Sequence, residues 1–109
     1  MKAMVLEKCA PVETAPLQWM EIPTPTPGPG EVRVKVKSCG VCRTDLHVIE
    51  GELPPLGRPV APGHQVVGIV DQLGEGCSRF KTGDRIGVAW LRHTCGDCVY
   101  CRAGQENLC

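Results

Sequence analysis

The sequence predicts a small, mainly β domain with one short helix and a cysteine-rich lobe. Thirteen glycines and ten prolines in 109 residues favour many turns and short elements. Residues 31–38 alternate between valines and polar side chains, which is the pattern of a strand with one solvated face. Several cysteines crowd together between Cys95 and Cys109, close enough in sequence to bind one metal ion.

Short apolar and β-branched runs separated by turn residues indicate five strands. We expect them over residues 1–6, 17–22, 31–38, 66–73 and 84–90. The segment 22–30 is rich in proline, which removes the backbone donors that a helix or a central strand needs. We therefore expect an extended connector there, and a turn region over residues 11–16.

Residues 42–50 lack the alternation of a strand and predict a short helix. Their mixture of apolar and polar side chains suits one or two helical turns. Gly51 and the Pro54–Pro55 pair would end this helix, because neither residue type continues a helix well.

Charge and hydropathy argue against several classes of partner. Twelve Lys and Arg balance twelve Asp and Glu, so no nucleic-acid-binding surface is indicated. The segment Met1–Leu6 is too short for the apolar core of a signal peptide and is followed by Glu7 and Lys8. No stretch approaches the length needed to span a membrane. We expect a cytoplasmic protein without nucleic-acid or membrane partners, in a compartment that keeps cysteines reduced.

The cysteine cluster has the spacing C-x2-C-x2-C-x7-C and comprises Cys95, Cys98, Cys101 and Cys109. Closely spaced thiolates can wrap a tetrahedral zinc ion, and four of them leave no open position for substrate. Disulfides and an iron–sulfur cluster are the alternatives. Ferredoxin-type clusters use C-x2-C-x2-C-x3-C followed by proline, and the fourth cysteine here is further away. The spacing therefore predicts a structural zinc site, whereas Cys9 and Cys77 are interpreted as ordinary small apolar residues.

A second, incomplete set of metal ligands precedes this lobe. Cys39 and Cys42 form a C-x2-C pair, and His64 lies in a Pro-Gly-His-Gln segment. A lone histidine in such a turn is often only a turn residue. The expected helix adds three side chains that suit a metal site: a hydroxyl and an imidazole that can share a helix face, and a carboxylate that can orient a ligand imidazole. They are Thr44, His47 and Asp45.

Four segments together resemble the zinc-dependent alcohol dehydrogenases of the medium-chain dehydrogenase/reductase superfamily. These segments are Cys39–His47, Pro62–His64, Gly83–Ile86 and the four-cysteine lobe. The resemblance runs from Met1 to Cys109 and implies the N-terminal GroES-like catalytic domain, a distorted β-barrel from which the zinc lobe projects. Residues 1–109 would be an incomplete copy of it, without the third catalytic zinc ligand and without the nucleotide-binding Rossmann domain.

One glycine pair imitates a nucleotide-binding motif. Gly74-Glu75-Gly76 follows an expected strand, but the dinucleotide fingerprint needs a third glycine where Arg79 stands, and a helix after it. We therefore interpret this segment as an ordinary turn.

The resemblance also implies roles for single residues. Cys42 and His64 would be ligands of the catalytic zinc, with Asp45 orienting His64, whereas Cys39 would be a bystander. Thr44 would hydrogen-bond the alcohol oxygen, and His47 would pass its proton outward through the cofactor ribose. Gln65 stands where most relatives carry a glutamate, so it keeps an oxygen that could approach the ion but loses the negative charge.

Trp90 resembles the bulky residue in the pocket of dehydrogenases that prefer small primary alcohols, and Ile49 would line the same pocket. The alternative for Trp90 is plain core packing at a strand end.

The implied parent protein is an NAD- or NADP-dependent alcohol dehydrogenase and a homo-oligomer, a dimer or a tetramer. It would oxidise small primary alcohols, and we expect the 109-residue chain alone to be inactive. Two alternatives stay open: a stand-alone zinc-binding module without enzymatic activity, and a related oxidoreductase acting on aldehydes, polyols or quinones.

Overall fold

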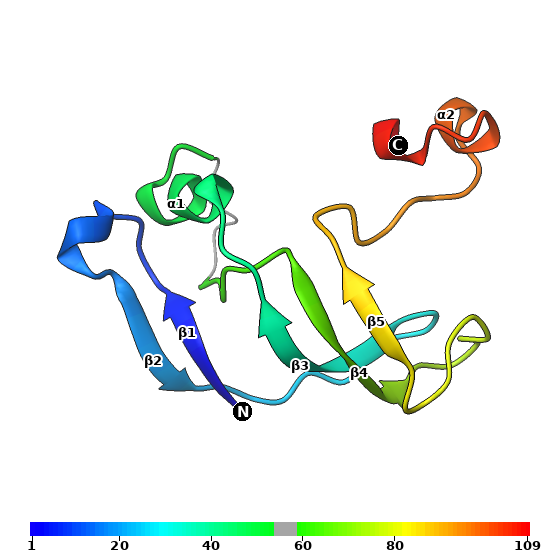
Figure 1. Cartoon of the computed structure of the whole chain (residues 1–109), viewed down its shortest axis with the longest axis horizontal. Coiled ribbons are helices and arrows are strands. Elements are labelled where there is room, and N and C mark those ends of the chain that lie inside the picture. Colours follow the sequence, from blue (N-terminus) through cyan, green and yellow to red (C-terminus); the bar gives the residue numbers. More distant parts are fainter. Residues whose placement is uncertain (54–58) are drawn as a thin grey trace.

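A computed structural model describes residues 1–53 and 59–109, which form two open antiparallel sheets and a small terminal lobe (Figure 1). One sheet pairs two strands: β1 (Lys2–Leu6) and β2 (Leu17–Glu21). The other has three strands in chain order: β3 (Val32–Cys39), β4 (Val66–Leu73) and β5 (Arg85–Val88). The helices are short: η1 (Val12–Thr14), α1 (Arg43–Glu50), α2 (Val99–Arg102) and η2 (Glu106–Leu108).

The predicted mainly β fold is confirmed, and the elements begin and end close to the predicted residues. The fourth strand has the predicted bounds, and the fifth ends at Val88, two residues before Trp90. Helix α1 ends at Gly51, whose φ of 82° is the left-handed conformation that glycine adopts readily. The predicted contribution of Pro54–Pro55 lies outside the described residues. The turn region 11–16 contains the 3₁₀ turn η1, which the sequence did not indicate.

The described chain has a small core. Val5 and Leu6 at the end of β1 and Ile49 in α1 are buried, and Val70 is fully buried in the middle of the three-stranded sheet. Leu6 exchanges two backbone hydrogen bonds with Val60, at 2.7 and 3.0 Å, which brings the chain after α1 back to β1. In the described residues the two sheets stay open and do not close into a barrel, in agreement with an incomplete GroES-like barrel.

Strand β3 departs from the simple alternation that predicts it. Val36 is 56% exposed although it belongs to the valine face, and the β3–β4 register shifts beside it and beside Arg33. On the other side, Arg33 Nε donates to Asp71 Oδ1 at 2.8 Å, and its NH1 donates to the Pro25 carbonyl at 3.3 Å. The arginine therefore ties the proline-rich connector to the sheet.

The turn at Gly74 shows why this segment is no nucleotide-binding loop. The Gly74 N–H donates to the Glu31 carbonyl at 2.8 Å, and the Gly30 N–H donates to the Glu75 carbonyl at 2.7 Å. A Cβ at Gly74 would lie 1.8 Å from the Gly28 carbonyl oxygen, so only glycine fits this close approach. The backbone groups are engaged by the connector, and the chain continues as turns rather than as a helix.

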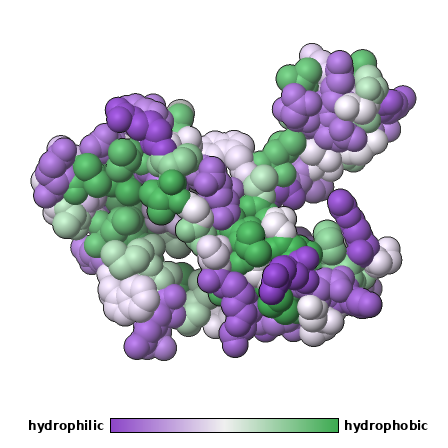
Figure 2. All heavy atoms as spheres, in the orientation of Figure 1, coloured by the Kyte–Doolittle hydropathy of each residue, from purple (hydrophilic) through white to green (hydrophobic). Residues whose placement is uncertain are grey.

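The four-cysteine lobe stands apart from the sheets in Figure 1, beyond residues 89–94, which have no regular secondary structure. Figure 2 shows hydrophobic residues over the two sheets and α1, whereas the lobe is mainly hydrophilic on this face. No helix among the described residues is long and apolar enough to cross a membrane.

Candidate metal centres

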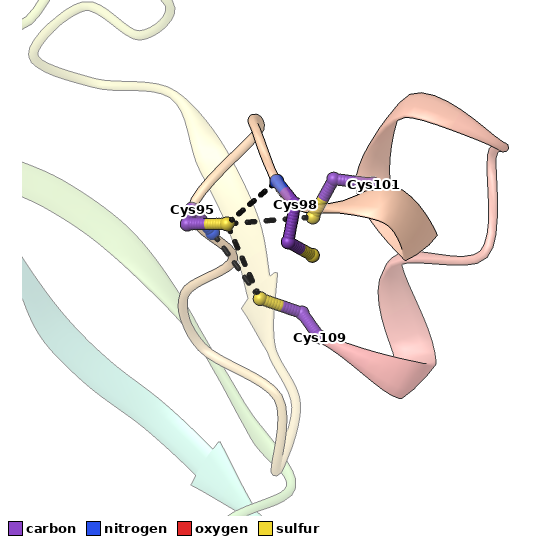
Figure 3. Close-up of side chains that lie close together, drawn as sticks. All are labelled: Cys95, Cys98, Cys101 and Cys109. Carbon is purple, nitrogen blue, oxygen red and sulfur yellow. Dashed lines mark hydrogen bonds between the residues drawn. The ribbon is translucent and has the colours of Figure 1, made fainter.

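The four cysteines of the lobe point toward one another (Figure 3), and their sulfur atoms all lie within 4.8 Å of each other. The Cys95 sulfur is 3.7 Å from that of Cys109 and 3.9 Å from that of Cys101. Four ligands at the usual Zn–S distance of about 2.3 Å form a tetrahedron with edges of about 3.8 Å. The sulfur distances therefore fit a tetrahedral ion. All eight cysteines of the chain are free, so these four form no disulfide.

Short turns bring these sulfurs together. Gly96 and Gly104 have φ values of 74° and 71°, which let the backbone reverse direction before and after α2. Cys98 directly precedes α2, and Cys101 lies on that helix. The Cys95 N–H donates to the Cys109 sulfur at 3.4 Å, which closes the lobe.

Local hydrogen bonds and burial give two of the thiols very different pKa values. Backbone N–H groups of Asp97 and Cys98, followed by the Cys109 side chain, lower the pKa of Cys95 to about 6. Partial burial, followed by the neighbouring Cys98 thiol, raises the pKa of Cys101 to about 12. Cys95 is therefore the thiol of the cluster that ionises most readily, and Cys101 the one that holds its proton most strongly and must release it to bind zinc.

The second candidate centre lies at the start of α1. The Cys42 sulfur is 3.2 Å from His64 Nε2, whereas His64 Nδ1 is 3.3 Å from Asp45 Oδ1. Asp45 is buried, and its Oδ2 accepts the backbone N–H of Cys42 at 2.7 Å, which caps the helix. The carboxylate thus contacts both the ligand loop and the imidazole, and it leaves Nε2 facing the sulfur.

These three side chains fit a metal ion. Their ligand atoms lie within 4.8 Å of one another. A thiolate and an imidazole bound to one tetrahedral zinc stand about 3.6 Å apart, slightly more than the distance between Cys42 and His64 here. A ligand histidine commonly donates its other ring N–H to a carboxylate, which is the position that Asp45 occupies.

Two glycines allow the segments that carry Cys42 and His64 to approach each other closely. Gly63 has a φ of 143°, and a Cβ there would lie 2.9 Å from the Cys39 sulfur. A Cβ at Gly40 would lie 2.6 Å from Gln65 Oε1. Cys39 is exposed and outside the Cys42–Asp45–His64 group, and the Gln65 side chain lies against Gly40.

His47 faces a partner that the sequence reasoning missed. Its Nδ1 pairs with the carboxylate of Glu52, and its backbone carbonyl accepts the N–H of Glu52 at 3.0 Å. The structure does not bring His47 into the metal-ligand group, and Thr44 lies half-buried in the first turn of α1. The available signal was an acidic residue just after Gly51, where the chain turns back over the end of the helix.

Trp90 lies beside the second centre and outside the core. Its ring meets the His64 imidazole edge-on, with centroids 5.1 Å apart and planes at 79°. The side chain is 60% exposed, so among the described residues Trp90 does not pack in the core. Ile49, in contrast, is buried as part of the core at 6% exposure.

The alcohol dehydrogenase GroES-like domain model matches residues 28–109. The chain belongs to this family. Across its whole length, this GroES-like domain is 50% identical to a probable alcohol dehydrogenase of Mycobacterium tuberculosis and 46% identical to an alcohol dehydrogenase of Geobacillus stearothermophilus. It covers 33% and 32% of those two proteins.

Solved structures agree with this assignment of the GroES-like domain. It superposes over its whole length on the crystal structure of AibC with a TM-score of 0.91 and 39% identity, covering 30% of that chain. A thermostable alcohol dehydrogenase from Pyrobaculum aerophilum, solved with cobalt and zinc bound, gives 0.90 and 33% identity over the whole domain and 32% of its own chain. The domain thus spans about a third of the length of these relatives.

Proposed function

We propose that this chain is the catalytic-domain portion of a zinc-dependent alcohol dehydrogenase that oxidises small primary alcohols with NAD or NADP. The observation that carries the proposal is the contact of Cys42 and Asp45 with opposite nitrogens of His64. A thiol and an imidazole nitrogen face each other while a buried carboxylate holds the imidazole. This donor set suits a catalytic zinc that keeps an open position for substrate.

In this proposal Cys42 and His64 hold the catalytic zinc, and Asp45 fixes the ring orientation of His64. Zinc would supply Lewis-acid activation of an alcohol hydroxyl, and the nicotinamide would supply the acceptor for hydride. Thr44 hydrogen-bonds the alcohol oxygen, and His47 carries its proton outward. The exposed Trp90 ring beside His64 supports a role in limiting substrate size, a role that Ile49 would share from the core.

The remaining parts of the proposal concern the parent protein. The four lobe cysteines bind a structural zinc, which their mutual distances support. A third ligand for the catalytic zinc and a dinucleotide-binding domain are supplied by polypeptide outside these residues, since relatives are about three times as long. The parent acts in the cytoplasm as a homo-oligomer.

Zinc analysis of the purified chain tests the proposal. The unmutated chain should bind two zinc ions and Cys42→Ser only one, because the lobe retains its ion. Cys39→Ser is the matched control, since Cys39 lies outside the ligand group, and it should still bind two. One zinc in both the unmutated chain and Cys42→Ser would show that only the lobe site is filled, and would favour a module with a structural site alone.

A further inference from the structure

Arg102 holds the loop that carries the first two cysteines of the lobe. Its Nε donates to the Asp97 backbone carbonyl at 2.6 Å, and its NH2 donates to Asp97 Oδ1 at 2.8 Å. Asp97 lies between Cys95 and Cys98, and Arg102 directly follows Cys101 on α2. One side chain therefore fixes the loop of two ligands against the helix of the third.

We propose that Arg102 is a positioning residue for the lobe zinc, acting through Asp97 to hold Cys95 and Cys98 at the distances that the ion requires. The inference rests on the proposal that these cysteines bind zinc. Asp97 is suited to transmit this constraint, because the N–H of the residue after it, Cys98, donates to the Cys95 sulfur at 3.3 Å. Fixing the Asp97 carbonyl fixes the plane of the Asp97–Cys98 peptide, and with it the direction of the Cys98 N–H.

An ordinary surface ion pair would not have this effect. The side chains of Arg102 and Asp97 are 70% and 86% exposed, and isolated pairs at such positions contribute little. The guanidinium here binds a carbonyl and a carboxylate at once, and its planar fork fixes both acceptors in one geometry. The contact therefore restrains the loop even though both side chains are in solvent.

If Arg102 acted only by offsetting negative charge, removing the Asp97 charge would have the opposite effect on zinc affinity. Arg102 is the sole lysine or arginine between Cys95 and Cys109, where four thiolates and one divalent ion leave two net negative charges. If charge alone mattered, removing the carboxylate of Asp97 would relieve repulsion and strengthen zinc binding. If Asp97 is part of a clamp, the same change weakens zinc binding, because the hydrogen bond from Arg102 to the side-chain oxygen loses its charge assistance.

The experiment measures zinc affinity by competition with a chromophoric chelator, in a Cys42→Ser background that leaves the lobe as the zinc site. We expect Arg102→Gln to weaken binding about tenfold or more and to accelerate zinc release to the chelator. Asp97→Asn should weaken binding about threefold. The zinc affinity of Arg102→Lys should lie between that of Arg102→Gln and that of the Cys42→Ser background. Arg92→Gln is the control: it removes a cation that meets Glu31 at 3.8 Å outside the lobe, and it should change affinity less than about twofold.

Two further readouts separate positioning from general damage. Cobalt-loaded Arg102→Gln should keep the absorption of a four-thiolate site with shifted ligand-field bands, and urea unfolding of the sheets should match the parent. Asp97→Asn binding as tightly as the parent, or more tightly, would overturn the clamp, as would Arg102→Gln within twofold of the parent. A Cys42→Ser chain that takes up no zinc would instead overturn the proposed lobe site and this inference with it.

Discussion

Buried Asp45 and half-buried His64 form a pair in which Asp45 Oδ1 lies 3.3 Å from the imidazole Nδ1. The other carboxylate oxygen accepts the backbone N–H of Cys42 at 2.7 Å. One aspartate therefore sets the start of α1 and the ring orientation of His64. The helix start and the candidate metal centre consequently depend on the same side chain.

Asp45→Asn should weaken zinc binding at the Cys42–His64 centre by about 10–100-fold. The amide keeps an oxygen for the Cys42 N–H but loses the charge that orients His64, so the cost to stability should stay near 1 kcal/mol. Zinc competition in a Cys95→Ser/Cys98→Ser background would measure the affinity. Asp84→Asn is the control, because Asp84 also accepts a backbone N–H from three residues upstream, that of Lys81 at 2.9 Å. Equal losses in both variants would contradict the role of Asp45.

Gly63→Ala should destabilise the loop that carries His64. At a φ of 143° an alanine is strained, and its Cβ would meet the Cys39 sulfur at 2.9 Å. We expect a loss of about 1–3 kcal/mol in the free energy of unfolding, measured by urea denaturation. Gly87→Ala is the control, since its nearest neighbour would be a backbone oxygen at 3.9 Å, and it should be neutral or slightly stabilising. Equal stability of the two variants would refute this explanation.

The Arg33–Asp71 pair should make stability depend on pH in the acid range. The Arg33 hydrogen bond and charge hold the pKa of Asp71 below its ordinary value of 3.8. The folded state therefore favours the ionised carboxylate, and this stabilisation is present above pH 4 and is lost as the pH falls through the lowered pKa. The urea midpoints of the parent and Asp71→Asn should converge as the pH drops. A difference that persists under fully acidic conditions would show that the contact acts by another route.

When the lobe takes up zinc, Cys95 and Cys101 should release different numbers of protons. Cys95, with a pKa of about 6, is largely ionised at pH 7 and releases few, whereas Cys101, with a pKa of about 12, releases one. Zinc affinity should therefore rise with pH across the neutral range. Calorimetry in buffers of different ionisation enthalpy would count the protons, and release of four at pH 7 would contradict the low pKa of Cys95.

Alcohol-dependent NADH formation should be absent from the purified 109-residue chain. The candidate centre offers one thiol and one imidazole beside Asp45, and the Gly74–Gly76 turn is engaged by the connector rather than free to bind phosphate. Measurable turnover with ethanol and NAD would refute this prediction.

The sequence predicts the strands well because their signals are local. The alternation over 31–38 and the β-branched run over 66–73 favour strands whatever the segments pack against. Gly51 ends α1 through its own backbone freedom. The grouping of Cys95, Cys98 and Cys101 follows from spacing, since cysteines three residues apart cannot lie far from one another. These features require no knowledge of the rest of the fold.

Contacts between distant residues were not predictable in the same way. The exposure of Val36 depends on whether a second layer covers the sheet, and the position of Trp90 depends on β5 ending two residues earlier. Each depends on tertiary neighbours, about which a periodic pattern carries no information.

Residues 89–94, which have no regular secondary structure, separate the lobe from the sheets. We therefore expect the lobe to unfold as a unit of its own. Its order comes from its own turns and from the ion that its cysteines are proposed to hold, rather than from burial against the sheets. Loss of metal would then open this unit locally, at a free-energy cost below that of global unfolding. Amide protons of α2 and η2 would exchange quickly after chelation, while those of β3 and β4 would keep the protection of an intact sheet.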